Sequence, residues 1–377
     1  MNFGLTEEQL ILKKTARDFL EKECPRSMVR EMATDETGYS PQLWQKMAEL
    51  GWLGLAFPDR YGGGDGSFLD LVALVEEMGR ALVPGPFFAT VVLSGLYLLE
   101  AASEAQKEEF LPKIAGGDTI LTLALNEPGS DYYAGSIATE AVLSQGEYII
   151  NGIKLFVPYA RVADYLLCVT RTGKAAEPED GITTFIINTG KPGITYSPLN
   201  TIGRDHQYEV IFKNAPATRE DILGDLDNAW KDVEKTLQKA TVLLCVEMNA
   251  AAREVLDMTV NYAKERVQFG RPTGSLSAIQ HHCANMTVSL EASCSLAYEA
   301  AWKISQDLPC AKEVSMAKSR ASECYTQITQ MGVMIHGGVG ITEEHDMPLY
   351  YRHAKASEII LGNSDSHREE IAKEILD

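Results

Sequence analysis

The sequence has few cysteines for its length and none of them paired at short spacing. The seven cysteines among 377 residues are scattered, odd in number and without a C-x-x-C pair. This pattern excludes a disulfide scaffold and a structural zinc site, and it indicates a reducing compartment. The adjacent His281 and His282 lack a second ligand cluster at metal-binding spacing. We therefore expect no metal.

Positive charge and long apolar runs are also scarce. Lys and Arg number 34 against 53 Asp and Glu, which gives a formal net charge of −19. Phosphate surfaces repel such a protein, so nucleic acid and anionic membranes are not expected partners. No apolar run approaches the ~18 residues of a membrane span, and the opening MNFGLTEEQL lacks the features of a signal peptide. We expect a soluble, cytoplasmic protein without membrane insertion.

What is present is a change of period along the chain. Residues 5–115 show the spacing of amphipathic helices, beginning at the capping-box pattern Thr6-x-x-Gln9. From about 118 to 222, short β-branched and aromatic runs alternate with Gly, Asn and Pro turns, which is typical of a small antiparallel barrel or sandwich. From about 228 the helical period returns.

This order predicts an α+β fold with three domains. An N-terminal α-helical domain is expected over residues 1–117, and a central antiparallel β-barrel or sandwich over 118–225. A C-terminal four-helix bundle is expected over 226–377.

Six short motifs occur along these regions. They are LAFPDRYGG (55–63), NEPG (126–129), IINGIKLF (149–156), ERVQFG (265–270), IHGGVG (335–340) and YRHAK (351–355). Each motif is weak alone. In this order, across about 300 residues, they resemble the acyl-CoA dehydrogenase family, and the resemblance covers essentially the whole chain.

The resemblance implies a flavoprotein that binds FAD and removes the α and β hydrogens of an acyl-CoA thioester. Electrons would pass to an electron-transferring flavoprotein, and subunits would form dimers or tetramers in which a neighbour helps to hold FAD. The residues that match the family's cofactor contacts are Asn126, Phe156, Pro158, Arg266, Gln268, Phe269, Met334, Gly337, Gly338, Asn363 and Asp365. By similarity, Arg266 supplies a cation to the pyrophosphate, and the two glycines approach the cofactor of an adjacent subunit.

Two segments depart from the family pattern. Phe156-Val157-Pro158 replaces Trp-Ile-Thr. Phe156 can still cover a flavin face, but Pro158 has neither a hydroxyl nor an N–H donor. In the loop near the CoA arm, where the family usually has Gly-Ser-Asp, Ser130 and Asp131 follow Gly129 and are followed directly by two tyrosines. We interpret the bulky tyrosines as favouring a bulky or cyclic acyl group.

The largest departure concerns the catalytic base. The family's usual glutamate precedes the glycine after the R-x-A-K helix, and here Leu361 precedes Gly362. An alternative position on the long helix matches Ala240, which is also apolar. Glu247 follows seven residues later, about 20° around the helix from Ala240 and within an apolar stripe. Because burying an unpaired carboxylate is costly, Glu247 is either paired with Arg or Lys or acts as the α-proton acceptor.

Three further interpretations stay open. The chain could be a non-catalytic partner subunit of an α2β2 acyl-CoA dehydrogenase, a branch that its segments 342–346 and 367–369 resemble. It could use elimination chemistry that needs no base at the usual position. It could also be a scaffold that kept the fold without catalysis. The FAD content of the protein, alone or with a co-expressed partner, separates these readings.

Overall fold

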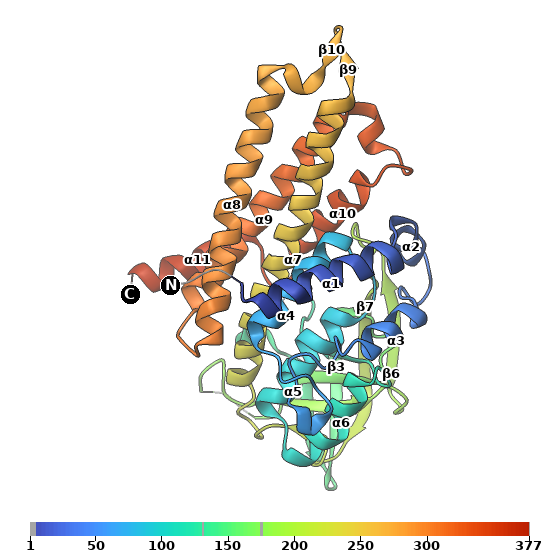
Figure 1. The fold of residues 1–377 in the computed structure, drawn as a ribbon. Helices are drawn as coiled ribbons and strands as arrows, with labels where there is room; N and C mark the ends of the chain where they lie inside the picture. Colours follow the sequence, from blue (N-terminus) through green and yellow to red (C-terminus); the bar gives the residue numbers. More distant parts are fainter. Residues whose placement is uncertain (1–4, 130–131, 174–175, 377) are drawn as a thin grey trace. The chain divides into compact units, whose positions relative to one another are not determined.

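A computed structural model describes residues 5–129, 132–173 and 176–376 (Figure 1). These residues form two compact units that interleave along the sequence. Unit 1 takes in the described residues up to 31, then 67–83 and 241–376, and unit 2 takes in those of 32–66 and 84–240. Helix α7, Trp230–Glu265, runs from unit 2 into unit 1.

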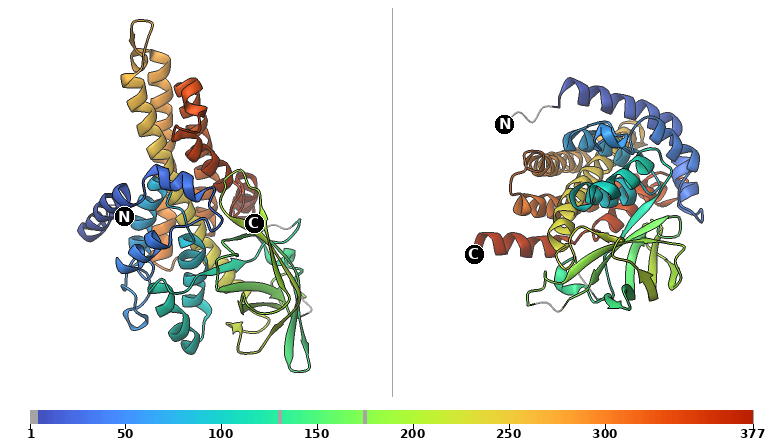
Figure 2. Two further views of the ribbon diagram at one scale, coloured as in Figure 1. Left: turned by 90° about the vertical axis from the view of Figure 1, so that its right-hand side faces the viewer. Right: turned by 90° about the horizontal axis from the view of Figure 1, so that it is seen from below.

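Unit 1 is built from helices and one small hairpin. Besides most of α7, its elements are α1 (Glu7–Glu23), α2 (Arg26–Met32, but for its last residue), α4 (Phe68–Ala81), β9 (Val267–Gln268), β10 (Arg271–Pro272), η4 (Thr273–Ser275), α8 (Ser277–Ser305), α9 (Ala311–His336), η5 (Gly337–Ile341), α10 (Met347–Ser357) and α11 (Ser364–Leu376). Figure 2 shows α7 and α8 side by side up to the β9–β10 hairpin that joins them. No helix in the described part of the chain is long and apolar enough to cross a membrane.

Local sequence sets the first helix of unit 1, as the capping-box pattern predicts. The Thr6 hydroxyl accepts a hydrogen bond from the backbone N–H of Gln9, and the Gln9 side chain accepts one from the N–H of Thr6. Two otherwise unpaired N–H groups at the helix start are thereby satisfied. Ser67 and Asp70 form the same reciprocal pair at the start of α4.

Helices α4 and α7 approach closely because α4 carries a glycine at the contact. A Cβ on Gly79 would lie 2.5 Å from the carbonyl oxygen of Glu247 and 2.7 Å from its Cα. Only hydrogen fits there without displacing the backbone of α7. The contact therefore fixes the position of Glu247 on α7 relative to α4.

Unit 2 holds the sheet and the helices around it. Its elements are α3 (Pro41–Glu49), η1 (Asp59–Tyr61), the π-helix η2 (Phe88–Gly95), α5 (Leu96–Ala101), α6 (Glu104–Ala115), β1 (Leu121–Ala124), η3 (Ala134–Ser136), β2 (Glu140–Ser144), β3 (Glu147–Pro158), β4 (Tyr165–Arg171), β5 (Ile182–Asn188), β6 (Ile194–Leu199), β7 (Gln207–Ala217), β8 (Ile222–Leu223) and the first part of α7. The predicted α+β class, with helices before and after a sheet, is confirmed.

The strands follow the order β6-β7-β3-β2-β4-β5-β8, and β1 pairs with β4. Pairing is mostly antiparallel, as expected, but β1 and β4 run parallel. The two strands β2 and β3 separate them in sequence, and a connection of that length allows parallel pairing. Strand β5 is buried at every position from Ile182 to Ile187, whereas the edge strand β6 contains no fully buried residue. The core of unit 2 is formed by buried side chains from β1, β2, β3, β4, β5 and β7.

The close approach at Gly79 gives a test of the packing in unit 1. Gly79→Ala is expected to lower the free energy of unfolding by about 1–3 kcal/mol, because the added methyl group overpacks the contact with α7. The normal gain in helix propensity of about 1 kcal/mol does not offset a clash with backbone atoms. Urea denaturation measures the difference.

Gly338→Ala is the matched control, because a Cβ at Gly338 meets nothing within 4 Å. Its unfolding free energy should stay close to the wild-type value. Equal stability of both variants and the wild type would contradict the close approach of α4 and α7.

Candidate functional site

The end of strand β3 carries the first predicted site residues. The β3–β7 register shifts between Lys154 and Val157, so this stretch contains a β-bulge. Phe156 lies in the bulge with a φ of 53°, and it is 50% exposed. Bulges redirect side chains away from the regular alternation of a strand. The resulting half-exposed ring is suited to stack against a flat ligand.

Two buried acceptors lie beside this bulge. The carbonyl oxygen of Asn126 accepts a hydrogen bond of 2.8 Å from the N–H of Leu155, next to Phe156. Within the described structure, the buried Oδ1 of Asn126 and Oε1 of Gln207 have no hydrogen-bond partner, and Gln207 pairs with Pro158 across β3 and β7. Buried polar atoms are rarely left without a partner. The set therefore fits a flat aromatic ligand that brings its own N–H or O–H groups.

Pro158 and Gln207 differ in how far the sequence could identify them. Pro158 has no donor, and its carbonyl oxygen accepts a hydrogen bond of 2.6 Å from the Thr122 hydroxyl. It can offer only ring surface to a ligand, in agreement with the sequence argument. Gln207 was not predicted, because a glutamine at the start of a strand carries no pattern that distinguishes it from a surface residue.

A buried ion pair lies under the NEPG loop. Lys154 Nζ donates a hydrogen bond of 2.6 Å to Glu127 Oε1, and the side chains are 0% and 6% exposed. The backbone N–H groups of residues 138 and 139 also donate to this carboxylate. The NEPG and IINGIKLF motifs, which lie apart in the sequence, thus meet at one contact. The sequence signal was a lysine among the apolar residues of a predicted strand.

The charge on Glu127 is set by competing effects. Burial opposes ionisation, but Lys154 and the hydrogen bond from the Thr139 N–H outweigh it, so the pKa of the Glu127 carboxyl lies below its ordinary value. A lowered folded pKa means that this group stabilises the fold at pH values above the unfolded pKa of about 4.3. That stabilisation is lost as the pH falls through the lower, folded value.

A second group of predicted residues lies at one end of the helices of unit 1. Tyr262 on α7 stacks on His336, with ring centroids 4.3 Å apart, and its hydroxyl donates to the His336 carbonyl oxygen at 3.3 Å. This contact ties the end of α7, where the β9–β10 hairpin begins, to the end of α9, where the glycine turn η5 begins (Figure 1). The predicted residues brought to this end are Arg266, Gln268, Phe269, Met334, Gly337 and Gly338.

This end of the bundle is apolar and open. Phe269 is 89% exposed and Met334 58%. A Cβ at Gly337 or Gly338 would meet nothing within 4 Å, and Gly337 has a φ of 63°. Exposed apolar side chains next to open backbone mark a contact surface.

The turn after α10 carries the vacant base position. Leu361 is 6% exposed and has a φ of 59°. Asn363 Oδ1 accepts hydrogen bonds from the N–H groups of Asp365 and Ser366, so it caps α11. Asp365 pairs with Arg368 at 3.0 Å. Both predicted cofactor contacts in this turn therefore already serve the start of a helix, and contact with a cofactor stays a prediction for them.

Glu247 is paired, and its partner is a histidine rather than an arginine or lysine. His353 Nε2 lies 3.1 Å from Glu247 Oε1, and His353 Nδ1 lies 3.2 Å from the Tyr325 hydroxyl. An ionised carboxylate only accepts hydrogen bonds, so Nε2 carries the proton and Nδ1 accepts from the tyrosine. Burial raises the pKa of Tyr325 well above its ordinary value, which keeps that hydroxyl protonated. The three side chains form one directed chain of hydrogen bonds.

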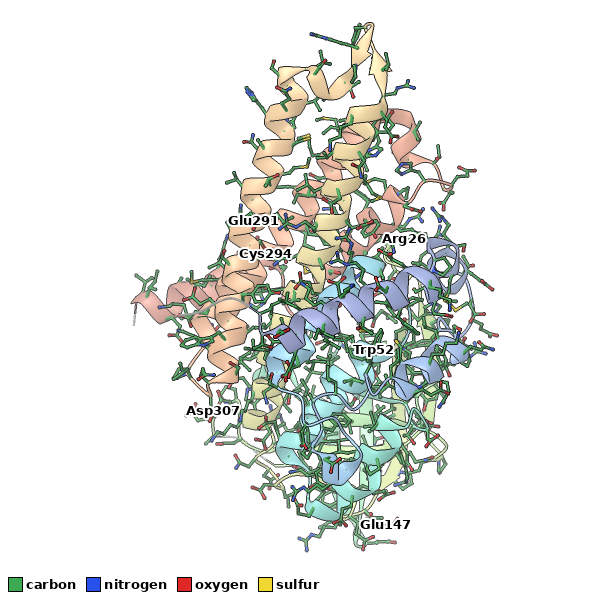
Figure 3. All side chains as sticks on the ribbon, viewed as in Figure 1. Arg26, Trp52, Glu147, Glu291, Cys294 and Asp307 are labelled. Atoms are coloured by element: carbon green, nitrogen blue, oxygen red, sulfur yellow. The ribbon has the colours of Figure 1, made fainter. Side chains whose placement is uncertain are left out.

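A small cavity in unit 1 lies on the face of α7 that meets α8. Asn249, Arg253 and Cys294 are among its lining residues. Arg253 pairs at 2.6 Å with Glu291, and Glu291 and Cys294 are both on α8 (Figure 3). Burial raises the pKa of the Cys294 thiol to about 11, so the thiol stays protonated. None of the predicted site residues lines this cavity.

Comparison with known proteins gives three matches in chain order. They are the family descriptions acyl-CoA dehydrogenase, N-terminal domain, over residues 6–118, middle domain over 122–215, and C-terminal domain over 228–376. The chain is 32% identical to probable acyl-CoA dehydrogenase YngJ of Bacillus subtilis, over 100% of both chains.

Solved structures agree with these matches. The chain is 30% identical to butyryl-CoA dehydrogenase of Megasphaera elsdenii, with a TM-score of 0.92 over 100% of both chains. It is 25% identical to a chain of the ChsE4–ChsE5 complex of Mycobacterium tuberculosis, with a TM-score of 0.91 over 100% of this chain and 99% of that one.

The buried ion pair under the NEPG loop makes a quantitative prediction. Lys154→Met is expected to lower the free energy of unfolding by about 3–5 kcal/mol at neutral pH, because it leaves a buried carboxylate unpaired. Adding Glu127→Gln should recover part of this loss. Denaturant unfolding of the two single variants and the double variant gives the coupling energy.

The same pair predicts a pH dependence. The stability difference between wild type and Lys154→Met should narrow as the pH falls below about 4.3, where Glu127 becomes protonated in the unfolded and then in the folded state. Lys191→Met is the control, because Lys191 pairs with Asp221 at 2.7 Å in a partly exposed position. Such a pair contributes about 1 kcal/mol or less, so equal losses at both lysines would refute the assignment.

Proposed function

The chain belongs to the acyl-CoA dehydrogenase family of oxidoreductases that act on CH–CH bonds, and from this premise we propose that it is an FAD-dependent α,β-dehydrogenase of an acyl-CoA thioester. Electrons would pass from it to an electron-transferring flavoprotein. The observation that carries the proposal is the half-exposed Phe156 beside the unpaired, buried Oδ1 of Asn126. This combination suits the isoalloxazine ring of a flavin, which has a flat apolar face and an N–H donor.

The remaining cofactor contacts follow the predicted residues. Arg266 would bind the pyrophosphate as a charge-assisted donor. Gly337 and Gly338 would let backbone approach the cofactor of a second subunit, because nothing lies within 4 Å of a Cβ at either position. The exposed Phe269 and Met334 would be covered by that subunit. When bound, FAD supplies the acceptor for the β-hydride.

Proton abstraction is assigned to Glu247, since Leu361 cannot accept a proton. The chain Tyr325–His353–Glu247 orients the carboxylate by a hydrogen bond to Oε1. The Glu247 side chain is 23% exposed, so it is not sealed in the core. A base held by an oriented histidine is a general arrangement for proton transfer.

A second candidate function is that of a non-catalytic subunit in an α2β2 assembly. The apolar, buried Leu361 at the base position favours it, as does the histidine that already engages Glu247. In that case the partner chain would supply the base. Elimination chemistry without a base is a third alternative. For the substrate, a bulky or cyclic acyl group remains the proposed class. Of the loop that led to that substrate proposal, Ser130 and Asp131 lie outside the described residues.

Anaerobic titration of the purified protein tests the proposal. A yellow protein whose flavin absorbance is bleached by an acyl-CoA is expected of a self-sufficient dehydrogenase. The panel should contain linear, branched and cyclic acyl-CoAs, and the thioester that bleaches fastest identifies the substrate class. A chain that holds FAD only with a co-expressed partner supports the second candidate. A chain that binds no FAD in either setting eliminates both.

The role of Glu247 is tested separately. Glu247→Gln should slow flavin reduction by acyl-CoA by about 100-fold or more, as expected for loss of a general base, while FAD content and unfolding temperature stay near wild type. Glu291→Gln is the control, because this carboxylate lies on α8 and pairs with Arg253 of α7 rather than with His353. Undiminished turnover in Glu247→Gln would reject the base assignment. In that case, the Leu361→Glu variant tests whether a carboxylate at position 361 can act as the base.

A further inference from the structure

Lys318 on α9 is a completely buried lysine outside the set of predicted site residues. Its ammonium group donates to three main-chain carbonyl oxygens, those of Ser357 at 3.0 Å, Glu358 at 3.1 Å and Gly362 at 2.9 Å. A fourth contact, at 3.0 Å, joins it to the hydroxyl of Ser322 on its own helix. All three carbonyl groups belong to the segment 357–362, which begins at the last residue of α10. This segment contains Leu361, which occupies the position of the family's usual base.

Helix ends explain why a cation is useful at this place. The last carbonyl groups of an α-helix have no donor within the helix, and they form the negative end of its dipole. A helix usually satisfies them with its own following residues. Here the ammonium of Lys318, from a different helix, serves the end of α10. The turn is therefore bound to α9 and does not rely on its own residues to satisfy these carbonyl groups.

A histidine binds a fourth carbonyl of the turn. His367 Nε2, from α11, lies 2.9 Å from the Leu361 carbonyl oxygen, and its Nδ1 lies 3.2 Å from the hydroxyl of Ser315. A carbonyl only accepts, so Nε2 is the donor and Nδ1 accepts from the serine. Ser315, Lys318 and Ser322 follow helical spacing along one face of α9. That face forms a polar seat for the turn, and we call Lys318 with His367 the turn clamp.

The turn needs such a clamp because its backbone is unfavourable. Leu361 has a φ of 59° and Gly362 a φ of 94°. The left-handed region suits glycine but is costly for leucine. Burying an ammonium group adds a further cost, and apolar replacements of buried charges often stabilise a protein. A charge kept in so costly a place, with three of its four hydrogen-bond partners in the backbone of one turn, points to a requirement for the shape of that turn.

We propose that Lys318 is a positioning residue, which holds the 357–362 turn in one conformation. Through Ser357, whose hydroxyl lies 3.4 Å from His353 Nε2, it also holds the histidine that orients Glu247. The inference rests on the proposed function, because Glu247 is the base proposed above.

The charged and titratable groups that face Lys318 are Cys245 from α7, Glu358 from the turn and His367 from α11. Burial lowers the pKa of Lys318 to about 8, so the ammonium form with its three N–H donors prevails at neutral pH.

Lys318→Met tests the proposal, because methionine keeps most of the length and loses the donors. Amide hydrogen exchange of the holoprotein is expected to quicken at least tenfold in residues 358–363. The rate of flavin reduction by saturating acyl-CoA should fall by about 100-fold, the effect of a displacement near 1 Å at a reacting centre, with little change in the acyl-CoA concentration at half-saturation. A merely structural role would not produce that split.

Lys312→Met is the matched control, because Lys312 lies on the same helix and its side chain is 43% exposed. It should change neither exchange nor rate. If Lys318→Met does not fold, His367→Leu removes the donor to the Leu361 carbonyl oxygen and serves the same purpose. Unchanged exchange in the turn overturns the clamp, and faster exchange with an unchanged rate overturns its part in the reaction. A wild-type protein that no acyl-CoA reduces would reject the proposed function, while the exchange data would still judge the clamp.

Discussion

Two lysines that water does not reach hold the loops on which the candidate site depends. Lys154 in unit 2 and Lys318 in unit 1 are both 0% exposed. Each ammonium group is surrounded by oxygen acceptors, because a buried charge without them would be expelled or neutralised. The first fixes the NEPG loop (126–129) against strand β3, two residues before Phe156. The second fixes the turn that contains Leu361. Apolar packing determines the fold, and these two cations determine the local shape of its functional loops.

Each unit carries features that match the predicted site, and one group that the resemblance implies is missing. In unit 2, a β-bulge exposes the ring of Phe156 beside buried acceptors that have no hydrogen-bond partner among the described residues. In unit 1, an open glycine turn follows α9. The expected proton acceptor is replaced by a leucine. Glu247 provides a carboxylate, but His353 already binds one of its oxygens. The structure is therefore consistent with two kinds of subunit, one that performs the whole reaction and one that completes the site of a partner.

Periodic and local features of this protein could be predicted from the sequence, and long-range polar contacts could not. The capping box at Thr6 and the order of helices and strands are encoded within a few residues, and both are confirmed. Glu247 was identified by its place on an apolar stripe, yet its partner His353 is 106 residues away and follows no period. The parallel pairing of β1 and the role of Gln207 depend in the same way on which strands become neighbours. The π-helix Phe88–Gly95 also escaped prediction, because its apolar residues fit an ordinary helix equally well.

The left-handed leucine has a consequence for how such proteins diverge. Side chains on α9 and α11 impose the conformation of the 357–362 turn, so residue 361 does not choose its own backbone geometry. Its side chain can then change in chemistry while the loop keeps its path. A single substitution at such a position can add or remove a reactive side chain while the fold stays the same.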